Sequence, residues 1–258
     1  MQIIEGDFLR ILLTNDDGIY AEGIRILAEV LRDNGHQVFI TAPDRERSAA
    51  GHSITILEPL RANRIDHYKN IEAYQINGTP ADCVKLGIEK LMSFSPELII
   101  SGINNGSNLG YDVLYSGTVS AAIEGWIMGF NSIAVSLVCK GKRKYITAAN
   151  YINNYISDFD LSVFKETILL NINVPDCEFN QVKGVRITKL GTSLYEDTYE
   201  ERTDPMGKKY YWISGGNGRD EKGENTDIVA VENDFISITP LKIDLNNENL
   251  IENWPGKK

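Results

Sequence analysis

The chain has few cysteines and no long apolar run, and each shortage excludes a class of protein. Cys83, Cys139 and Cys177 are odd in number and widely spaced, which argues against a disulfide framework and against a zinc knuckle. No apolar run approaches the length that spans a bilayer, and the start of the chain lacks a basic segment followed by a long apolar stretch. We therefore expect a cytoplasmic protein that is not inserted in a membrane.

Basic charge is also scarce. The 258 residues include 26 Lys and Arg against 36 Asp and Glu, which gives a net charge of −10. Duplex nucleic acid and anionic membranes are bound through basic patches, so neither is an expected partner. A protein of this charge that binds a phosphorylated small molecule needs local positive charge, which a divalent cation or a helix N-terminus can supply.

Strand and helix patterns alternate through the first half of the chain. This rhythm predicts an α/β fold, with a doubly wound, mostly parallel, Rossmann-like sheet and helices on both faces. Strands are predicted at 10–14, 37–42, 53–60, 71–76, 98–101, 133–137, 168–173, 185–189, 229–231 and 235–239, and helices at 21–34, 80–92, 118–129 and 146–156.

The sequence divides into three predicted parts. Residues 1–9 precede the first core strand and form an N-terminal extension, either native or a remnant of expression. Residues 10–190 form the α/β catalytic core. Residues 191–258 form a β-hairpin or extended arm and a C-terminal segment that partly returns to the core. Because aromatic residues are concentrated in this polar arm, we expect a neighbouring subunit to bury them: Tyr195, Tyr199, Tyr210, Tyr211 and Trp212.

Two adjacent carboxylates, Asp16 and Asp17, follow the first predicted strand directly. In a parallel sheet this position is the carboxyl edge, where open α/β folds bind their ligands. Crowded carboxylates repel each other, and a cation between them relieves the repulsion. Their hard oxygen ligands indicate Mg²⁺, Mn²⁺ or Ca²⁺. The alternative is an ordinary Asx turn and helix cap.

Two further strand-end loops and one helix start are expected at the same edge. The loop after 37–42 contains Ser48, and the glycine-rich loop after 98–101 contains Asn104; their oxygens complete a site for a small divalent ion, although both residue types also serve turns. The segment Tyr115-Ser116-Gly117-Thr118-Val119 opens a helix with small residues, which suits a phosphate-binding site. Capping by Ser116 or Thr118 is compatible with that role.

Six ordered motifs extend from Arg10 to about Leu241. They are Thr14-Asn15-Asp16-Asp17-Gly18, the loop Arg47-Ser48-Ala49-Ala50-Gly51-His52-Ser53-Ile54-Thr55, Asn77-Gly78-Thr79-Pro80-Ala81-Asp82-Cys83-Val84, Ser101-Gly102-Ile103-Asn104-Asn105-Gly106 with Asn108 and Gly110, Tyr115-Ser116-Gly117-Thr118-Val119, and Ser237-Ile238-Thr239-Pro240-Leu241. Together these motifs closely resemble the SurE survival-protein family of nucleotidases.

The resemblance implies a metal-dependent phosphomonoesterase that acts on nucleoside 5′- and 3′-monophosphates and, in some members, on short polyphosphate. It also implies homodimers or tetramers assembled through the C-terminal extension, and one Mg²⁺ or Mn²⁺ per subunit. The implied metal ligands are Asp16, Asp17, Ser48 and Asn104. The residues expected to bind the phosphate are Asn108, Ser116, Gly117 and Thr118.

Two catalytic questions stay open at this point. Water is the favoured attacking group over the carboxylate of Asp16, because a carboxylate that binds a metal is a poor nucleophile. His52 could protonate the leaving oxygen, or it could be a hydrogen-bonded loop histidine.

Two alternative functions are considered for the protein as a whole. They are a metal-dependent nucleotide-sugar transferase and a non-catalytic nucleotide-binding module. A dehydrogenase is disfavoured, since no Gly-x-Gly-x-x-Gly turn follows the first strand.

Overall fold

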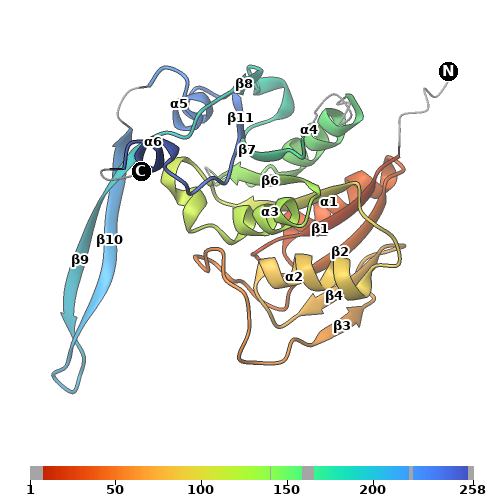
Figure 1. Ribbon diagram of the computed structural model, residues 1–258, viewed down its shortest axis with the longest axis horizontal. Coiled ribbons are helices and arrows are strands. Elements are labelled where there is room, and N and C mark those ends of the chain that lie inside the picture. Colours follow the sequence, from red (N-terminus) through yellow and green to blue (C-terminus); the bar gives the residue numbers. More distant parts are fainter. Residues whose placement is uncertain (1–7, 140, 159–165, 221–222, 255–258) are drawn as a thin grey trace.

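The computed structural model describes residues 8–139, 141–158, 166–220 and 223–254. It contains a nine-stranded sheet covered by helices and a separate two-stranded hairpin (Figure 1). The predicted α/β class and doubly wound architecture are thereby confirmed. Of the predicted N-terminal extension, residues 1–7 lie outside the described residues; Leu9 N, which follows them, donates to His36 Nδ1 at 3.1 Å.

The sheet has the strand order β3-β4-β2-β1-β5-β6-β7-β11-β8, so the first strand lies near its centre. β1 pairs in parallel with β2 on one side and with β5 on the other. The strands are β1 (Arg10–Thr14), β2 (Gln37–Pro43), β3 (Ala62–Ile65), β4 (Glu72–Ile76), β5 (Leu98–Asn105), β6 (Asn131–Val138), β7 (Leu169–Pro175), β8 (Val185–Ile187) and β11 (Ile236–Pro240).

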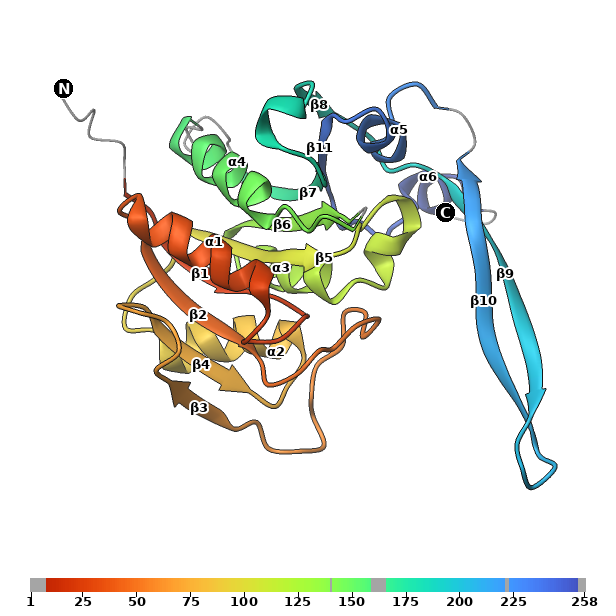
Figure 2. The same ribbon diagram turned by 180° about the vertical axis from the view of Figure 1, so that it is seen from behind.

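Helices cover both faces of the sheet (Figures 1 and 2). α1 (Glu22–Asp33) and α4 (Tyr145–Asp158) pack together on one face, and α2 (Pro80–Leu86) and α3 (Gly117–Ile127) pack together on the other. Alternate strand residues supply the two cores, because successive side chains point to opposite faces. Ile11 and Leu13 belong to the α1 side, whereas Leu12 belongs to the α2 side.

This arrangement places a topological switch point between β1 and β5. The chain leaves β1 toward α1 on one face and leaves β5 toward α3 on the opposite face, so the connecting segments separate at this point. Such a switch point is where doubly wound sheets bind ligands. The connections β5-α3-β6 and β6-α4-β7 both move one strand along the sheet in the same direction, but α3 and α4 lie on opposite faces. The two connections therefore have opposite hands. The β6-α4-β7 connection is the left-handed one and departs from the usual right-handed rule.

Most predicted elements are confirmed within a few residues, and two predictions were wrong. Residues 53–60 do not form a strand; bonds from Thr55 N and Oγ1 to Asp82, at 3.0 and 2.6 Å, tie this segment to α2. The predicted strand at 229–231 is part of helix α5 (Asp227–Glu232), since Thr226 caps that helix by accepting from Val229 N. A three-residue apolar run does not distinguish strand from helix.

The C-terminal part contains a long hairpin that projects away from the sheet, as both views show (Figures 1 and 2). Its strands, β9 (Ser193–Thr203) and β10 (Lys209–Asp220), pair in antiparallel orientation. The predicted arm is therefore present. After it, α5 and β11 return the chain to the body, and α6 (Glu248–Glu252) follows. Among the described helices, none has the length and apolar character needed to cross a membrane.

Candidate active site

The turn after β1 presents two adjacent carboxylates at the carboxyl edge of the sheet. Asn15 closes the turn: its Nδ2 donates to Gly18 O at 2.9 Å, and its Oδ1 accepts from Gly18 N at 3.2 Å. Gly18 has a φ of +100° and lies so close to Arg45 that a Cβ would be 3.1 Å from the Arg45 carbonyl carbon. Glycine suits both constraints. The local sequence therefore fixes where Asp16 and Asp17 lie.

Two neighbouring loops are bonded to this turn. Arg47 N, in the loop after β2, donates to Asp16 O at 2.8 Å. Asn105 N, at the end of β5, donates to Asp17 Oδ2 at 3.0 Å. The segments that follow β1, β2 and β5 therefore meet at the two carboxylates, which is the convergence expected when parallel strands end at one edge.

The start of α3 packs directly against Asp16. Thr118 Oγ1 donates a hydrogen bond to Asp16 Oδ1. Gly117 approaches so closely that a Cβ on it would lie 2.8 Å from Asp16 Cβ. Ser116 caps the helix, with its Oγ accepting from Val119 N at 3.1 Å. Because the first N–H groups of a helix lack intrahelical acceptors, α3 places partial positive charge beside the carboxylates.

Both carboxylates lie where their charged form is disfavoured in the metal-free protein. Burial raises the pKa of Asp16, which is 6% exposed, and hydrogen bonds from Thr118 oppose part of that rise. Burial also raises the pKa of Asp17 to about 6, and the charge of Asp16 adds to that rise. A bound cation would offset both the burial and the mutual repulsion, so the electrostatics favour one.

Asp17 makes the stability of the metal-free protein depend on pH. Its pKa is about 6 in the folded protein against an ordinary value of 3.8, so the folded state binds more protons between these values. Stability therefore falls as the pH rises through this window and is constant above it. We expect Asp17→Asn to raise the free energy of unfolding near pH 7.5 by about 1–2 kcal/mol, after a discount for partial exposure, and to change little near pH 3.5.

Urea unfolding of metal-free protein at the two pH values checks this expectation, with Asp33→Asn as the control. Asp33 is an exposed acid at the end of α1 that pairs with Arg32. An Asp17→Asn protein that is no more stable than the wild type at the higher pH would contradict the assigned cause.

Ser48 and Asn104 are the other two predicted metal ligands. Ser48 lies in the loop after β2 and Asn104 lies near the end of β5, and both segments are bonded to the Asp16-Asp17 turn. Ser48 Oγ donates to Glu46 Oε1 at 2.5 Å. Asn104 Nδ2 donates to Gly106 O at 2.9 Å, so the amide oxygen is the atom of that side chain suited to a cation. Metal binding by these residues stays a prediction.

Asn108 is bonded to β6 and β7. Its Nδ2 donates to Ser136 Oγ at 2.7 Å, and its main-chain oxygen accepts from Asn171 Nδ2 at 2.8 Å and Asn173 Nδ2 at 3.0 Å. These bonds anchor the loop after β5, and the expected contact with phosphate stays a prediction. We did not predict roles for Asn171 and Asn173; two asparagines at alternate positions of a buried strand were the available signal.

Two buried acids hold the long loop after β2 in place. Glu124 on α3 is 5% exposed; its Oε2 lies 2.9 Å from His52 Nε2 and its Oε1 lies 3.0 Å from Lys85 Nζ. Asp82 on α2 is 3% exposed and accepts from Thr55. Of the two roles considered for His52 from the sequence, proton donor and hydrogen-bonded loop histidine, these contacts support the second. The role of Glu124 was not predicted, because its partners are distant in sequence.

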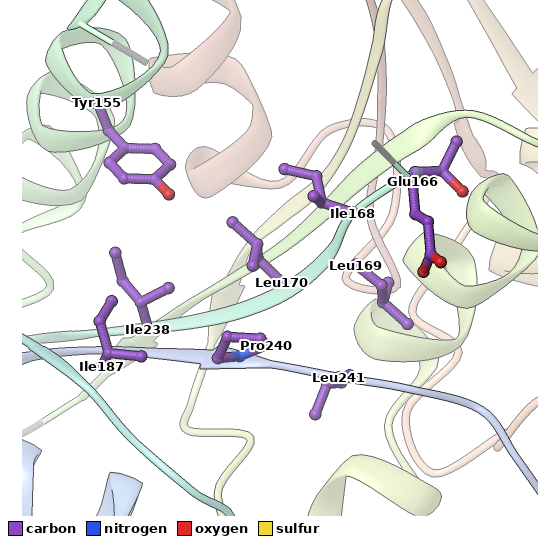
Figure 3. A pocket seen from close by; sticks show the side chains of 10 residues that line it. Tyr155, Glu166, Ile168, Leu169, Leu170, Ile187, Ile238, Pro240 and Leu241 are labelled. Carbon is purple, nitrogen blue, oxygen red and sulfur yellow. The ribbon is translucent and has the colours of Figure 1, made fainter. Parts of the chain in front are cut away.

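A cavity of about 550 Å³ lies elsewhere, between α4 and strands β7 and β11 (Figure 3). Leu169 and Leu170 open β7, so the cavity is at the amino edge of the parallel strands, opposite the edge that bears Asp16. Most of its lining is apolar, as Ile168, Ile238 and Leu241 show. The cavity lacks the cluster of polar groups found at the edge of the sheet that bears Asp16. That edge is therefore the candidate active site.

Comparison with known proteins gives concordant matches. The family described as "Survival protein SurE" matches residues 11–197. A protein of Natranaerobius thermophilus named 5′-nucleotidase SurE is 48% identical over 256 residues, covering 95% of this chain and 98% of the relative. A protein of the same name from Gloeobacter violaceus is 46% identical over 242 residues, covering 93% of this chain and 92% of the relative.

A solved structure agrees with these sequence matches. The crystal structure of the SurE protein from Aquifex aeolicus matches with a TM-score of 0.81 and 38% sequence identity, over 95% of this chain and 98% of that one. The family match includes the turn with Asp16, the loops after β2 and β5, and the start of α3. The resemblance seen in the six motifs is confirmed, and the chain belongs to the SurE family of survival proteins.

Proposed function

We propose that the protein hydrolyses the phosphate monoester of nucleoside 5′- and 3′-monophosphates in a metal-dependent reaction, releasing nucleoside and inorganic phosphate. The observation that supports this most strongly is the contact of Asp16 with the start of α3. It brings a carboxylate suited to a cation and a helix start suited to an anion to one point. The name shared by the relatives agrees with nucleotide phosphate hydrolysis. Short polyphosphate is a further proposed substrate.

The residues at this edge fit one Mg²⁺ or Mn²⁺ per subunit. Asp16, Asp17, Ser48 and Asn104 would hold it, and they offer oxygen donors, which these hard cations prefer. Across the described ranges, no group of three or more His, Cys, Asp or Glu side chains could hold a metal ion. A zinc site built from such a cluster is therefore not supported there. The raised pKa values of the two aspartates favour a cation, because it stabilises their charged forms.

The chain's own groups bind and orient the phosphate. The N–H groups at the start of α3, from Gly117 and Thr118, would receive phosphate oxygens, and Ser116, which caps α3, and Asn108 would limit their orientation. When bound, the metal ion would polarise the phosphoryl group and offset the charge that develops in the transition state. Burial of Asp16 excludes bulk water from its carboxylate and so strengthens these interactions.

Water is the proposed attacking group. Asp16 Oδ1 accepts from Thr118, and the residue is almost fully buried, so this carboxylate is held in place rather than free to attack phosphorus. His52 is tied to Glu124 at 2.9 Å, which supports a role in holding the loop rather than in protonating the leaving oxygen.

Release of inorganic phosphate tests the proposal. The purified protein is incubated with Mg²⁺ or Mn²⁺ and a panel of nucleoside 5′- and 3′-monophosphates, short polyphosphate and a nucleotide sugar. We expect phosphate from the monophosphates and none from the nucleotide sugar. Transfer or cleavage of the nucleotide sugar would instead favour the transferase. Nucleotide binding without turnover would favour a non-catalytic binding module.

We also propose that the arm joins subunits into a homodimer or tetramer. Tyr211 and Trp212 are 57% and 60% exposed and lie on opposite faces of β10, while the side chain of Tyr195 lies outside the described residues. Exposed aromatic residues on a projecting hairpin are typical of a surface that a partner buries. We expect light scattering at micromolar concentration to show an oligomer, and Tyr211→Lys with Trp212→Lys to convert it to monomers.

The control for the arm variant is Leu245→Lys, which changes an exposed apolar residue after β11. Removing the whole C-terminal part is not a suitable control, because β11 pairs with β7 in the sheet. A monomeric wild-type protein would contradict the assembly proposal. An oligomer that survives the double substitution would contradict the role of the arm.

A further inference from the structure

Glu46 stands beside the proposed metal site and has no role in the proposal above. It lies in the loop after β2, two residues before Ser48, and its Oε1 accepts the hydroxyl proton of Ser48 at 2.5 Å. This is a short, charge-assisted bond between an exposed carboxylate and a neighbouring hydroxyl. It determines where the proton of Ser48 points, and therefore where the oxygen lone pairs of Ser48 are free to point.

The negative charge of Glu46 also reaches the two aspartates. It contributes to raising the pKa of both Asp16 and Asp17, although burial is the larger cause in each case. Yet the described residues include no three acidic side chains arranged to share one metal ion. Glu46 is thus close enough to influence the site without being a ligand of the same ion.

We infer that Glu46 is a positioning residue for the metal site, acting through the hydroxyl of Ser48. By accepting the hydroxyl proton, it turns the lone pairs of Ser48 toward the cation and makes the oxygen a stronger donor. Partners that orient a metal ligand in this way typically change metal affinity by about 10- to 100-fold when they are removed. The inference rests on the metal site proposed above.

Calorimetric titration of metal-stripped protein with Mn²⁺ tests this inference without measuring activity. We expect Glu46→Ala to weaken Mn²⁺ binding at least about tenfold, and Glu46→Gln, which keeps a neutral acceptor, to weaken it less. Glu58→Gln is the control, because Glu58 is an exposed acid in the same loop whose loss removes the same charge. We expect this control to bind Mn²⁺ as the wild type does.

The decisive comparison is made in a protein that also carries Ser48→Ala. If Glu46 acts through Ser48, Glu46→Ala has little additional effect there, because the hydroxyl it orients is gone. An equal effect in both backgrounds would show a general charge effect and overturn the inference. Unchanged affinity in Glu46→Ala would do the same. If the wild-type protein bound no Mn²⁺, both this inference and the proposed metal site would fail. If the wild-type protein bound Mn²⁺ and the Glu46 variants bound it equally well, only the inference would be overturned.

Discussion

Asp17→Asn is expected to lower the turnover of nucleoside monophosphates by at least about a hundredfold at saturating metal, the scale of losing one element of a preorganised electrostatic site. The substitution keeps the size of the side chain and leaves an oxygen that can accept from Asn105 N, as Asp17 Oδ2 does at 3.0 Å. What it removes is one negative charge beside the proposed metal site. The loss should therefore appear in turnover and metal affinity rather than in folding.

Steady-state kinetics over a range of Mg²⁺ and Mn²⁺ concentrations measure this effect. Asp33→Asn is the matched control, because it removes the same charge from an exposed position at the end of α1. We expect that control to retain wild-type turnover. Near-normal turnover of Asp17→Asn at saturating metal would place the catalytic site elsewhere in the molecule.

Gly117→Ala is expected to lower turnover by roughly ten- to a hundredfold while the protein remains folded, since small displacements of catalytic groups have costs of this order. A Cβ on Gly117 would lie 2.8 Å from Asp16 Cβ and 3.0 Å from Asp16 Oδ2, so Asp16 would have to shift. The backbone itself tolerates alanine, because Gly117 opens helix α3 and alanine favours helices. The methyl group therefore acts mainly by moving Asp16.

The control for this substitution is Gly223→Ala. Among the described residues, a Cβ there would meet only the Thr226 methyl group, at 3.0 Å. We expect normal turnover in the control and similar thermal unfolding in both variants. A folded Gly117→Ala protein with wild-type turnover would show that the close contact between α3 and Asp16 has no part in catalysis.

The position of the candidate site could be predicted because it follows from strand direction. The carboxyl ends of parallel strands share an edge, so an Asp-Asp turn after β1 and polar loops after β2 and β5 must meet there. The bonds from Arg47 N to Asp16 and from Asn105 N to Asp17 show that they do. Capping is equally local: Thr79 stands directly before α2, and its side chain accepts from Asp82 N.

Other features depend on contacts between distant parts of the chain and could not be predicted from local patterns. Glu124 is buried in α3, and only the fold brings it to His52 and Lys85. The edge strand β3 was not predicted, because the sequence of Ala62–Ile65 shows little alternation of apolar and polar residues. Only its pairing with β4 in the structure identifies it as a strand. The bond between Ser48 and Glu46 is local, yet spacing alone does not show where a loop side chain points.

We propose that phosphate release needs a divalent cation held at Asp16 and Asp17. The decisive experiment follows phosphate release from a nucleoside 5′-monophosphate while the protein is stripped with excess chelator and then titrated with Mg²⁺ or Mn²⁺. We expect activity to disappear in chelator and to return as either ion is added, because these ions suit the oxygen donors at this edge. Full activity in excess chelator would contradict the claim.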